Sequence, residues 1–251
     1  MTLLSTVQSF CRRQGLTPPN TVMGSGDDTI NQIYALLEEE CIDLAQRGPW
    51  AGLRNECTFT SLANEVQGTL ESLGSAPTST NNLNYIIDQT FWDRTQRLPV
   101  RGPYDAQDWQ AIKAVNVTGP QYYYRILGQT NGGTAQLLMN PVPPAGHTMA
   151  FEYITWNWCR NITSSGTVTA GQAFVNDTDQ FQLPDNIVMM GLRWRYKKEK
   201  GLPYAEDFDT YESMVTTGLA RSGTKPVLHM DSCGYEPKPG IWVPSGNWPT
   251  P

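Results

Sequence analysis

Apolar residues recur at helical spacing in two segments near the N-terminus. The first segment carries its apolar residues on one face: Leu3, Leu4, Val7, Phe10 and Cys11. Gly15 supplies a C-terminal stop. The second segment has a longer stripe: Ile30, Ile33, Tyr34, Leu37, Cys41 and Leu44. Asp27 and Asp28 suit its N-terminus, where carboxylates accept from free N–H groups, and Gly48-Pro49 ends it. The pattern predicts two amphipathic helices.

From Trp50 to Phe181 short runs of β-branched and aromatic residues alternate with Gly, Pro, Asn and Ser. Five runs are expected to be strands: Glu56–Thr60, Tyr122–Leu127, Gln136–Asn140, Thr148–Thr155 and Val168–Val175. The TNGGT sequence at 130–134 predicts a hairpin turn between the second and third. Asp105 is expected to cap one helix among the strands, with Trp109 and Ile112 facing inward. This region therefore predicts an antiparallel sandwich or an α+β unit.

Helical spacing returns after Phe181. One helix has Pro184 near its first turn, stops at Gly201 and carries an apolar face: Ile187, Val188, Gly191 and Leu192. The next begins near Pro203 and carries a second apolar face: Tyr204, Phe208, Tyr211, Val215 and Leu219. Residues 224–251 include six prolines, which exclude a continuous helix or a central strand. We expect this segment to be an extended arm with three aromatic anchors: Tyr235, Trp242 and Trp248.

Each pair of helices is too small to enclose a core, so packing the pairs together buries both apolar faces. The sequence therefore predicts an α+β fold: a discontinuous antiparallel helical bundle with an inserted antiparallel β-sandwich-like domain and an extended C-terminal arm. The helical domain comprises residues 1–49 and 182–223, the β-rich domain residues 50–181, and the arm residues 224–251. This arrangement requires contact between the second helix and the two C-terminal helices.

The composition and net charge of the chain disfavour some classes of function, among them general nucleic-acid binding and membrane proteins. With 39% hydrophobic and 17% charged residues the chain is typical of globular proteins, and its formal net charge of -6 disfavours general binding to phosphate backbones. The N-terminal apolar run is too short for a signal peptide, and no stretch reaches the roughly 20 apolar residues needed to cross a bilayer. We expect a soluble protein, with no membrane association, that is made in a cytoplasm. The five cysteines lack a CxxC pair and are expected to be free thiols.

Residues of the kinds that carry catalysis are scarce. The chain has two histidines, and the cluster His229, Asp231 and Cys233 offers at most three ligands where a structural zinc site needs four. Motifs for nucleotide phosphates, zinc proteases and serine hydrolases are absent from the sequence. We therefore predict no catalytic residues, no cofactor and no metal.

Two groups of carboxylates are visible, and a glycosidase needs only two carboxylates. Asp177 and Asp179 are expected to form a turn with a capping role before the Pro184 helix. Glu38–Glu40 are expected to form a solvated helix face. The alternatives of a glycan-degrading enzyme and of a lectin-like carbohydrate-binding module stay open.

Basic residues crowd the latter part of the Pro184 helix: Arg193, Arg195, Lys197 and Lys198. Cations there complement the negative end of the helix dipole. The functional alternative is an acidic partner surface or passing nucleic acid. These four residues and the three aromatic anchors of the arm are the predicted partner-binding residues.

Several sequence blocks occur in a distinctive order: ECTFT (56–60), TFWDRT (90–95), GPYDAQDW (102–109), PPAG-x-T-x-AFEY (143–153), FVNDTDQFQLPD (174–185) and GLRWRYKKEKGLPYAEDFDTYE (191–212). Their order resembles the head-to-tail adaptor of short-tailed bacteriophages, the tail tubular protein A type. The resemblance covers most of residues 1–220 and weakens in the last thirty. It rests on the order of the blocks, since no single motif is diagnostic.

The resemblance implies a helical adaptor domain, a β domain and a place in the virion neck. Dodecameric copies would form a ring between the portal protein and the tail nozzle or tail fibres. That ring would let double-stranded DNA pass during genome ejection without sequence-specific binding. In this family the C-terminal segment reaches along or into the portal, a role that Trp242 and Trp248 would serve here.

Overall fold

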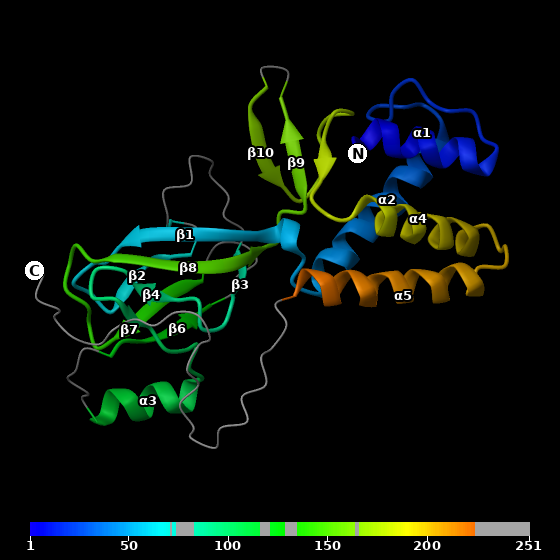
Figure 1. Ribbon diagram of the computed structural model, residues 1–251. Helices are drawn as coiled ribbons and strands as arrows, with labels where there is room; N and C mark the ends of the chain where they lie inside the picture. Colours follow the sequence, from blue (N-terminus) through cyan, green and yellow to red (C-terminus); the bar gives the residue numbers. More distant parts are fainter. Residues whose placement is uncertain (71, 74–82, 116–120, 129–134, 164–165, 224–251) are drawn as a thin grey trace, which may run out of the picture.

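The computed structural model describes residues 1–70, 72–73, 83–115, 121–128, 135–163 and 166–223 (Figure 1). Four helices gather at one end of the molecule: α1 (Leu3–Gln14), α2 (Asp28–Arg47), α4 (Asp185–Glu199) and α5 (Ala205–Ser222). Most of the strands and helix α3 (Ala106–Val115) lie at the other end. The fold is α+β, as the sequence predicts.

The ends of the two N-terminal helices follow from their capping residues. Thr2 and Ser5 form a reciprocal capping box at the start of α1, and Gly15 ends the helix in the left-handed conformation, with φ 72°. At the start of α2, the Asp27 carboxylate accepts a hydrogen bond of 2.8 Å from the Thr29 N–H. Arg47 is the last residue of α2 before Gly48. The predicted end of α1 at Gly15 and both predicted ends of α2 are confirmed.

Helices from both ends of the sequence share one apolar core. Helix α2 packs against α4, α4 packs against α5, and α1 contacts both α2 and α4. The Phe10 ring of α1 meets the Tyr196 ring of α4 edge-on, with centroids 5.2 Å apart. The best-buried members of this core come from all four helices and the segment after α2: Leu3, Phe10, Ile33, Leu37, Leu44, Trp50, Val188, Leu192 and Tyr211. The predicted contact of α2 with the first of the two C-terminal helices, α4, is therefore present.

Two antiparallel sheets form the other end. The five-stranded sheet runs β1 (Arg54–Thr60), β8 (Thr148–Thr155), β4 (Trp92–Asp93) and β5 (Leu98–Pro99), and β3 (Leu83–Ile86) also pairs with β8. The three-stranded sheet runs β2 (Val66–Thr69), β7 (Gln136–Asn140) and β6 (Tyr123–Leu127). The predicted bounds of β7 and β8 are confirmed. Strands β6 and β7 pair antiparallel, and the predicted turn at 130–134 between them lies outside the described residues.

The two sheets enclose a second core. Met149, Phe151 and Tyr153 of β8 contribute to it from the five-stranded sheet, and Leu137 and Met139 of β7 from the three-stranded sheet. Edge-on ring contacts join the layers, since the Phe91 centroid lies 5.0 Å from that of Tyr124 and 5.3 Å from that of Phe151. In α3, Trp109 is buried as predicted, whereas Ile112 is only half-buried.

A third sheet, formed by β9 (Cys159–Ile162), β10 (Val168–Gly171) and β11 (Gln180–Phe181), packs with the helices. Trp158, Cys159, Phe174 and Phe181 belong to the helical core. The sequence places these residues in the β-rich domain 50–181, because strand periodicity does not reveal which core a strand faces. Strand β10 ends at Gly171 instead of Val175, because the chain then turns to bury Phe174 against Trp158, with centroids 4.9 Å apart.

The turn at Asp177–Asp179 serves α1, so its interpretation as a cap for α4 is wrong. Leu3 N–H donates to the Asp179 carbonyl over 2.8 Å, and Leu4 N–H donates to the Asp177 carbonyl over 3.1 Å. These carbonyls satisfy free N–H groups of the first turn of α1. The Asp179 side chain is fully buried and accepts from Ile162 N–H over 2.8 Å. The turn therefore ties the third sheet to the N-terminus.

Candidate functional site

The four basic residues predicted on α4 face different environments. Arg193 and Lys198 are exposed and Lys197 is half-buried. The Arg195 side chain is only 11% exposed, because it points between the helices. Three of the four cations therefore reach the surface, and Arg195 is instead part of the interior.

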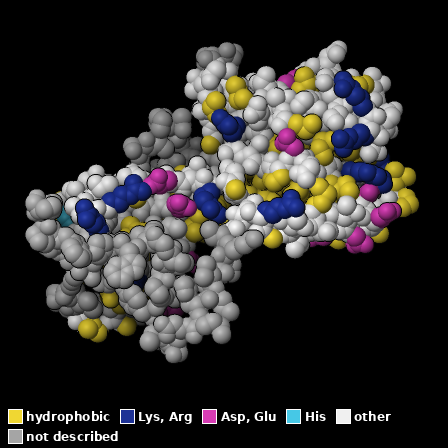
Figure 2. Space-filling model, in the orientation of Figure 1, with side chains coloured by type: hydrophobic (Ala, Val, Ile, Leu, Met, Phe, Trp, Pro, Cys, Tyr) yellow, Lys and Arg dark blue, Asp and Glu magenta, His cyan; other side chains and the backbone are white. Residues whose placement is uncertain are grey.

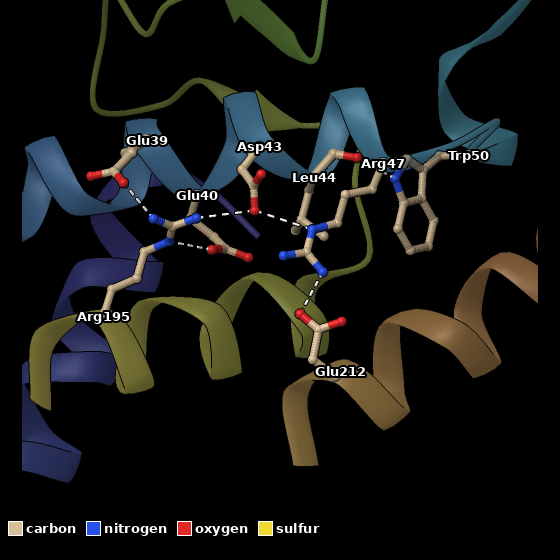
Figure 3. Close-up of polar contacts among 8 residues, drawn as sticks. All are labelled: Glu39, Glu40, Asp43, Leu44, Arg47, Trp50, Arg195 and Glu212. Carbon is tan, nitrogen blue, oxygen red and sulfur yellow. Dashed lines mark hydrogen bonds and ion pairs between the residues drawn. The ribbon is translucent and has the colours of Figure 1, made fainter. Parts of the chain in front are cut away.

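Arg195 uses its guanidinium fork to hold α4 against α2 (Figure 3). Its Nε donates to Glu40 over 2.6 Å, and its Nη2 donates to Asp43 over 3.1 Å. A third bond runs from Nη1 to the exposed carboxylate of Glu39. One cation thus bridges three carboxylates of α2, a geometry that suits the planar fork of arginine.

Arg47 extends this ion network to α5 (Figure 3). Its Nε donates to Asp43 over 3.1 Å, and its Nη1 donates to Glu212 over 2.6 Å. The guanidinium also lies over the Tyr211 ring, 5.3 Å from the centroid. Beside it, the Trp50 indole N–H donates to the Leu44 carbonyl over 2.6 Å, which satisfies the end of α2. The network therefore joins all three helices α2, α4 and α5.

Glu40 is fully buried, so its predicted place on a solvated helix face is wrong. It lies three residues after Leu37 and four before Leu44, at positions that share the apolar stripe, and this spacing is the signal that identifies it. Burial raises the pKa of Glu40 to about 7, against the opposing effect of the Arg195 guanidinium. The carboxylate fits because Gly191 of α4 faces it: a Cβ there would lie 2.0 Å from Glu40 Oε1.

A cavity of about 620 Å³ lies where α4 turns into α5. Arg193 and Lys197 line it together with the apolar residues Met190 and Leu202. Arg193 Nη2 lies 3.2 Å from Asp207 Oδ1, and Lys197 also pairs with that carboxylate. An acidic group of a partner would compete with Asp207 for two cations at the surface. This is the part of the predicted basic cluster that suits an acidic surface.

The predicted aromatic anchors Tyr235, Trp242 and Trp248 lie outside the described residues, as do His229 and Cys233. Among the described residues, no group of three or more His, Cys, Asp or Glu side chains is arranged to hold a metal ion.

Cys11, Cys41, Cys57 and Cys159 are free and buried, and burial raises the pKa of both Cys57 and Cys159 to about 12. Within the described ranges, no helix has the length and apolar character to cross a membrane.

A buried acid–base pair in the β region has no counterpart in the sequence analysis. His147 Nδ1 lies 2.8 Å from Asp93 Oδ2, and the Asp93 carboxylate is fully buried. The N–H groups of Thr95 and Gln96 donate to its other oxygen over 2.9 Å and 3.0 Å. Ser61 Oγ accepts from the His147 backbone N–H over 3.0 Å. The pair therefore anchors the loop before β8 to the turn after β4.

In the described residues, ion pairs join helices α2, α4 and α5, and cations of α4 lie at the surface of this helical region. Its side-chain network is arranged to fix three helices relative to one another. No protein-family model matches the chain, and no curated protein sequence is significantly similar to it.

Proposed function

We propose that the chain is a structural connector of a bacteriophage virion. In this role it is one subunit of a dodecameric ring that joins the portal protein to the tail nozzle or tail fibres and continues the DNA channel. The proposal includes the antiparallel helical bundle and residence in the virion neck. The observation that carries it is the single core shared by α1, α2, α4 and α5, with the two-sheet region inserted between the second and third of them. This is the domain organisation that the resemblance implies.

The ion network supports a structural role, because it fixes the helices relative to one another. A ring subunit is contacted by neighbours on two sides and by components above and below, so its helices must keep their relative positions. Arg195 and Arg47 connect α2 to α4 and α5 through four carboxylates: Glu39, Glu40, Asp43 and Glu212. Breaking one contact therefore disturbs three helices together.

The surface of α4 and the segment after α5 supply the proposed contacts. Arg193 and Lys198 present positive charge on α4, and a neighbouring acidic surface would complement it. Helix α5 ends at Ser222, and Trp242 and Trp248 follow in the arm. Tryptophan carries a large share of the energy of many protein interfaces, which suits a docking arm.

Negative-stain microscopy of the protein mixed with its cognate portal tests the proposal. Portal alone and the protein alone are the controls. We expect portal rings to gain an additional symmetric layer whose mass fits a ring of this chain. The absence of any layer over a range of salt concentrations, with both components folded, would refute the connector role.

A further inference from the structure

The outer face of the five-stranded sheet carries a second cavity, of about 560 Å³. Residues from β1, β4 and β8 and the turns beside them line it, among them Glu56, Trp92, Arg94, Arg97 and Glu152. In Figure 2, acidic and basic side chains are interspersed over the region of β1 and β8. A cavity of this size accommodates a small ligand or part of a chain.

The strand register places the polar residues on the outer face. Phe151 and Met149 of β8 face the core between the sheets, so Ala150 and Glu152 face outward. Glu56 of β1 is the direct partner of Glu152, and Trp92 of β4 is the direct partner of Ala150. The indole therefore stands on the same face as the two carboxylates, roughly 7 Å further along the sheet.

Two like charges directly opposite each other destabilise a sheet. Arg94 relieves part of this cost by pairing with Glu56, and both side chains remain about half exposed. Glu152 and Arg97 have no ion-pair partner within the described ranges of the chain. Among the residues that the structure describes, the cavity thus offers an acceptor carboxylate and a donor guanidinium without an ion-pair partner.

The backbone around the cavity is also unusual. Gln89 and Arg97, with φ of 61° and 59°, are the non-glycine residues with left-handed φ in the described part of the chain, and both line this cavity. Such conformations cost free energy and cluster at binding sites. Beneath them, the buried Asp93–His147 pair fixes the residue next to Trp92. The backbone that carries the Trp92 indole is therefore held in place by this pair.

We propose that this cavity binds a neutral carbohydrate chain. The third carboxylate in the lining, Asp93, is buried and paired with His147. The two exposed carboxylates and the two exposed guanidinium groups sum to no net charge, which favours a ligand that is uncharged and rich in hydroxyl groups. Sugar hydroxyls donate to Glu56 and Glu152 and accept from Arg94 and Arg97, while the apolar face of a sugar ring stacks on the Trp92 indole. This binding is independent of portal docking, so it stands or fails separately from the connector role.

The charges in the cavity disfavour anionic and cationic ligands relative to a neutral carbohydrate. The exposed carboxylate of Glu152 would repel a phosphate or an acidic glycan, and the exposed guanidinium of Arg97 would repel a polycation. A second copy of this chain is the competing macromolecular partner, because charged surfaces with both signs also pair with themselves. The test below separates that outcome from sugar binding.

The full chain is screened on an array of neutral bacterial and plant polysaccharides, and oligosaccharides of the strongest signal are titrated by calorimetry. We expect saturable binding that weakens about tenfold or more in Trp92→Ala and in Glu152→Gln, because each removes one direct contact. Tyr204→Ala and Glu199→Gln, on exposed positions of the helical region, are the matched controls and should bind as the unchanged chain does. Glu152→Gln keeps the test valid if Trp92→Ala fails to fold, since Glu152 is exposed.

Three results would overturn the proposal. The first is the absence of saturable binding to every neutral glycan on the array. The second is binding that Glu152→Gln leaves unchanged. The third is a change in sedimentation of Glu152→Gln without any sugar binding, which would assign the cavity to contact between copies of the chain.

Discussion

Arg195 and Glu40, which lie 155 residues apart in the sequence, form a charged hydrogen bond of 2.6 Å between α4 and α2. The carboxylate is fully buried and the guanidinium nearly so. Because a buried charge without its partner is costly, this contact makes the two ends of the helical region interdependent.

Replacing Arg195 with Met should strongly destabilise the protein. Above pH 7, where Glu40 is ionised, the change leaves its carboxylate buried without its cation, and removing one partner of a buried pair costs about 3–5 kcal/mol. Urea unfolding followed by circular dichroism measures the loss. Lys198→Met, at an exposed position of the same helix, should change the unfolding free energy by about 0.5 kcal/mol or less.

The double variant Glu40→Met/Arg195→Met sharpens this experiment. Removing both charges together should restore most of the lost stability, because no uncompensated buried charge remains, and the other two carboxylates that Arg195 contacts are exposed to solvent. If Arg195→Met behaves like Lys198→Met, the buried pair does not hold the helices together.

Stability should depend on pH through Glu40. Burial raises the pKa of this carboxyl to about 7 in the folded protein, whereas its ordinary value is 4.5. Between these values the folded state keeps a proton that the unfolded state has released, so the free energy of unfolding falls as pH rises, by at most about 1.4 kcal/mol per pH unit. Unfolding of the unchanged chain and of Glu40→Gln should therefore be compared from pH 5 to pH 8. Parallel profiles for the two proteins would contradict the prediction.

Gly52→Ala should disturb the junction between β1 and the segment that leads into α4. A Cβ at this position would lie 2.0 Å from the Gln182 carbonyl oxygen, and a backbone atom cannot move aside as a flexible side chain does. We expect a loss of about 1–3 kcal/mol in the free energy of unfolding. Gly26→Ala is the control, since no atom lies within 4 Å of its Cβ position. Equal stability of the two variants would show that the junction has room to adjust.

Removing residues 224–251 should separate folding from assembly. In the part of the chain that the structure describes, both apolar cores consist of residues before 224, so thermal unfolding should change little. Incorporation into heads, measured by the yield of particles with a complete neck, should fall sharply. Trp242→Ala and Trp248→Ala should each reproduce part of the defect. Normal incorporation of the truncated chain would refute the arm model.

Local signals predicted local structure well. Asp27 and Gly15 identify helix ends from their own chemistry, and the run of β-branched and aromatic residues at Thr148–Thr155 identifies β8 with its bounds. The arrangement of α3 was only partly predictable, because a helix with Trp109 as its one buried anchor has a weak stripe.

Contacts between residues far apart in the chain could not be predicted from the sequence. Glu40 reads as solvated when taken with Glu38 and Glu39, and its burial depends on Arg195 and Gly191 on another helix. The Asp93–His147 pair joins two turns 54 residues apart, which no spacing rule connects. The cavity on the five-stranded sheet likewise depends on the pairing of β1, β4 and β8, which is fixed by tertiary structure.

The shared core of α1, α2, α4 and α5 has a consequence for synthesis on the ribosome. Arg195 is translated 155 residues after Glu40, a delay of roughly 8 to 30 seconds at usual elongation rates. Until then the apolar face of α2 has no partner among the C-terminal helices, although both sheets of the inserted region have already been made. A chain that stops before α4 leaves uncovered the part of that face that packs against α4, open to chaperones and proteases. We therefore expect quality control during translation to recognise interrupted chains by the exposed part of this face.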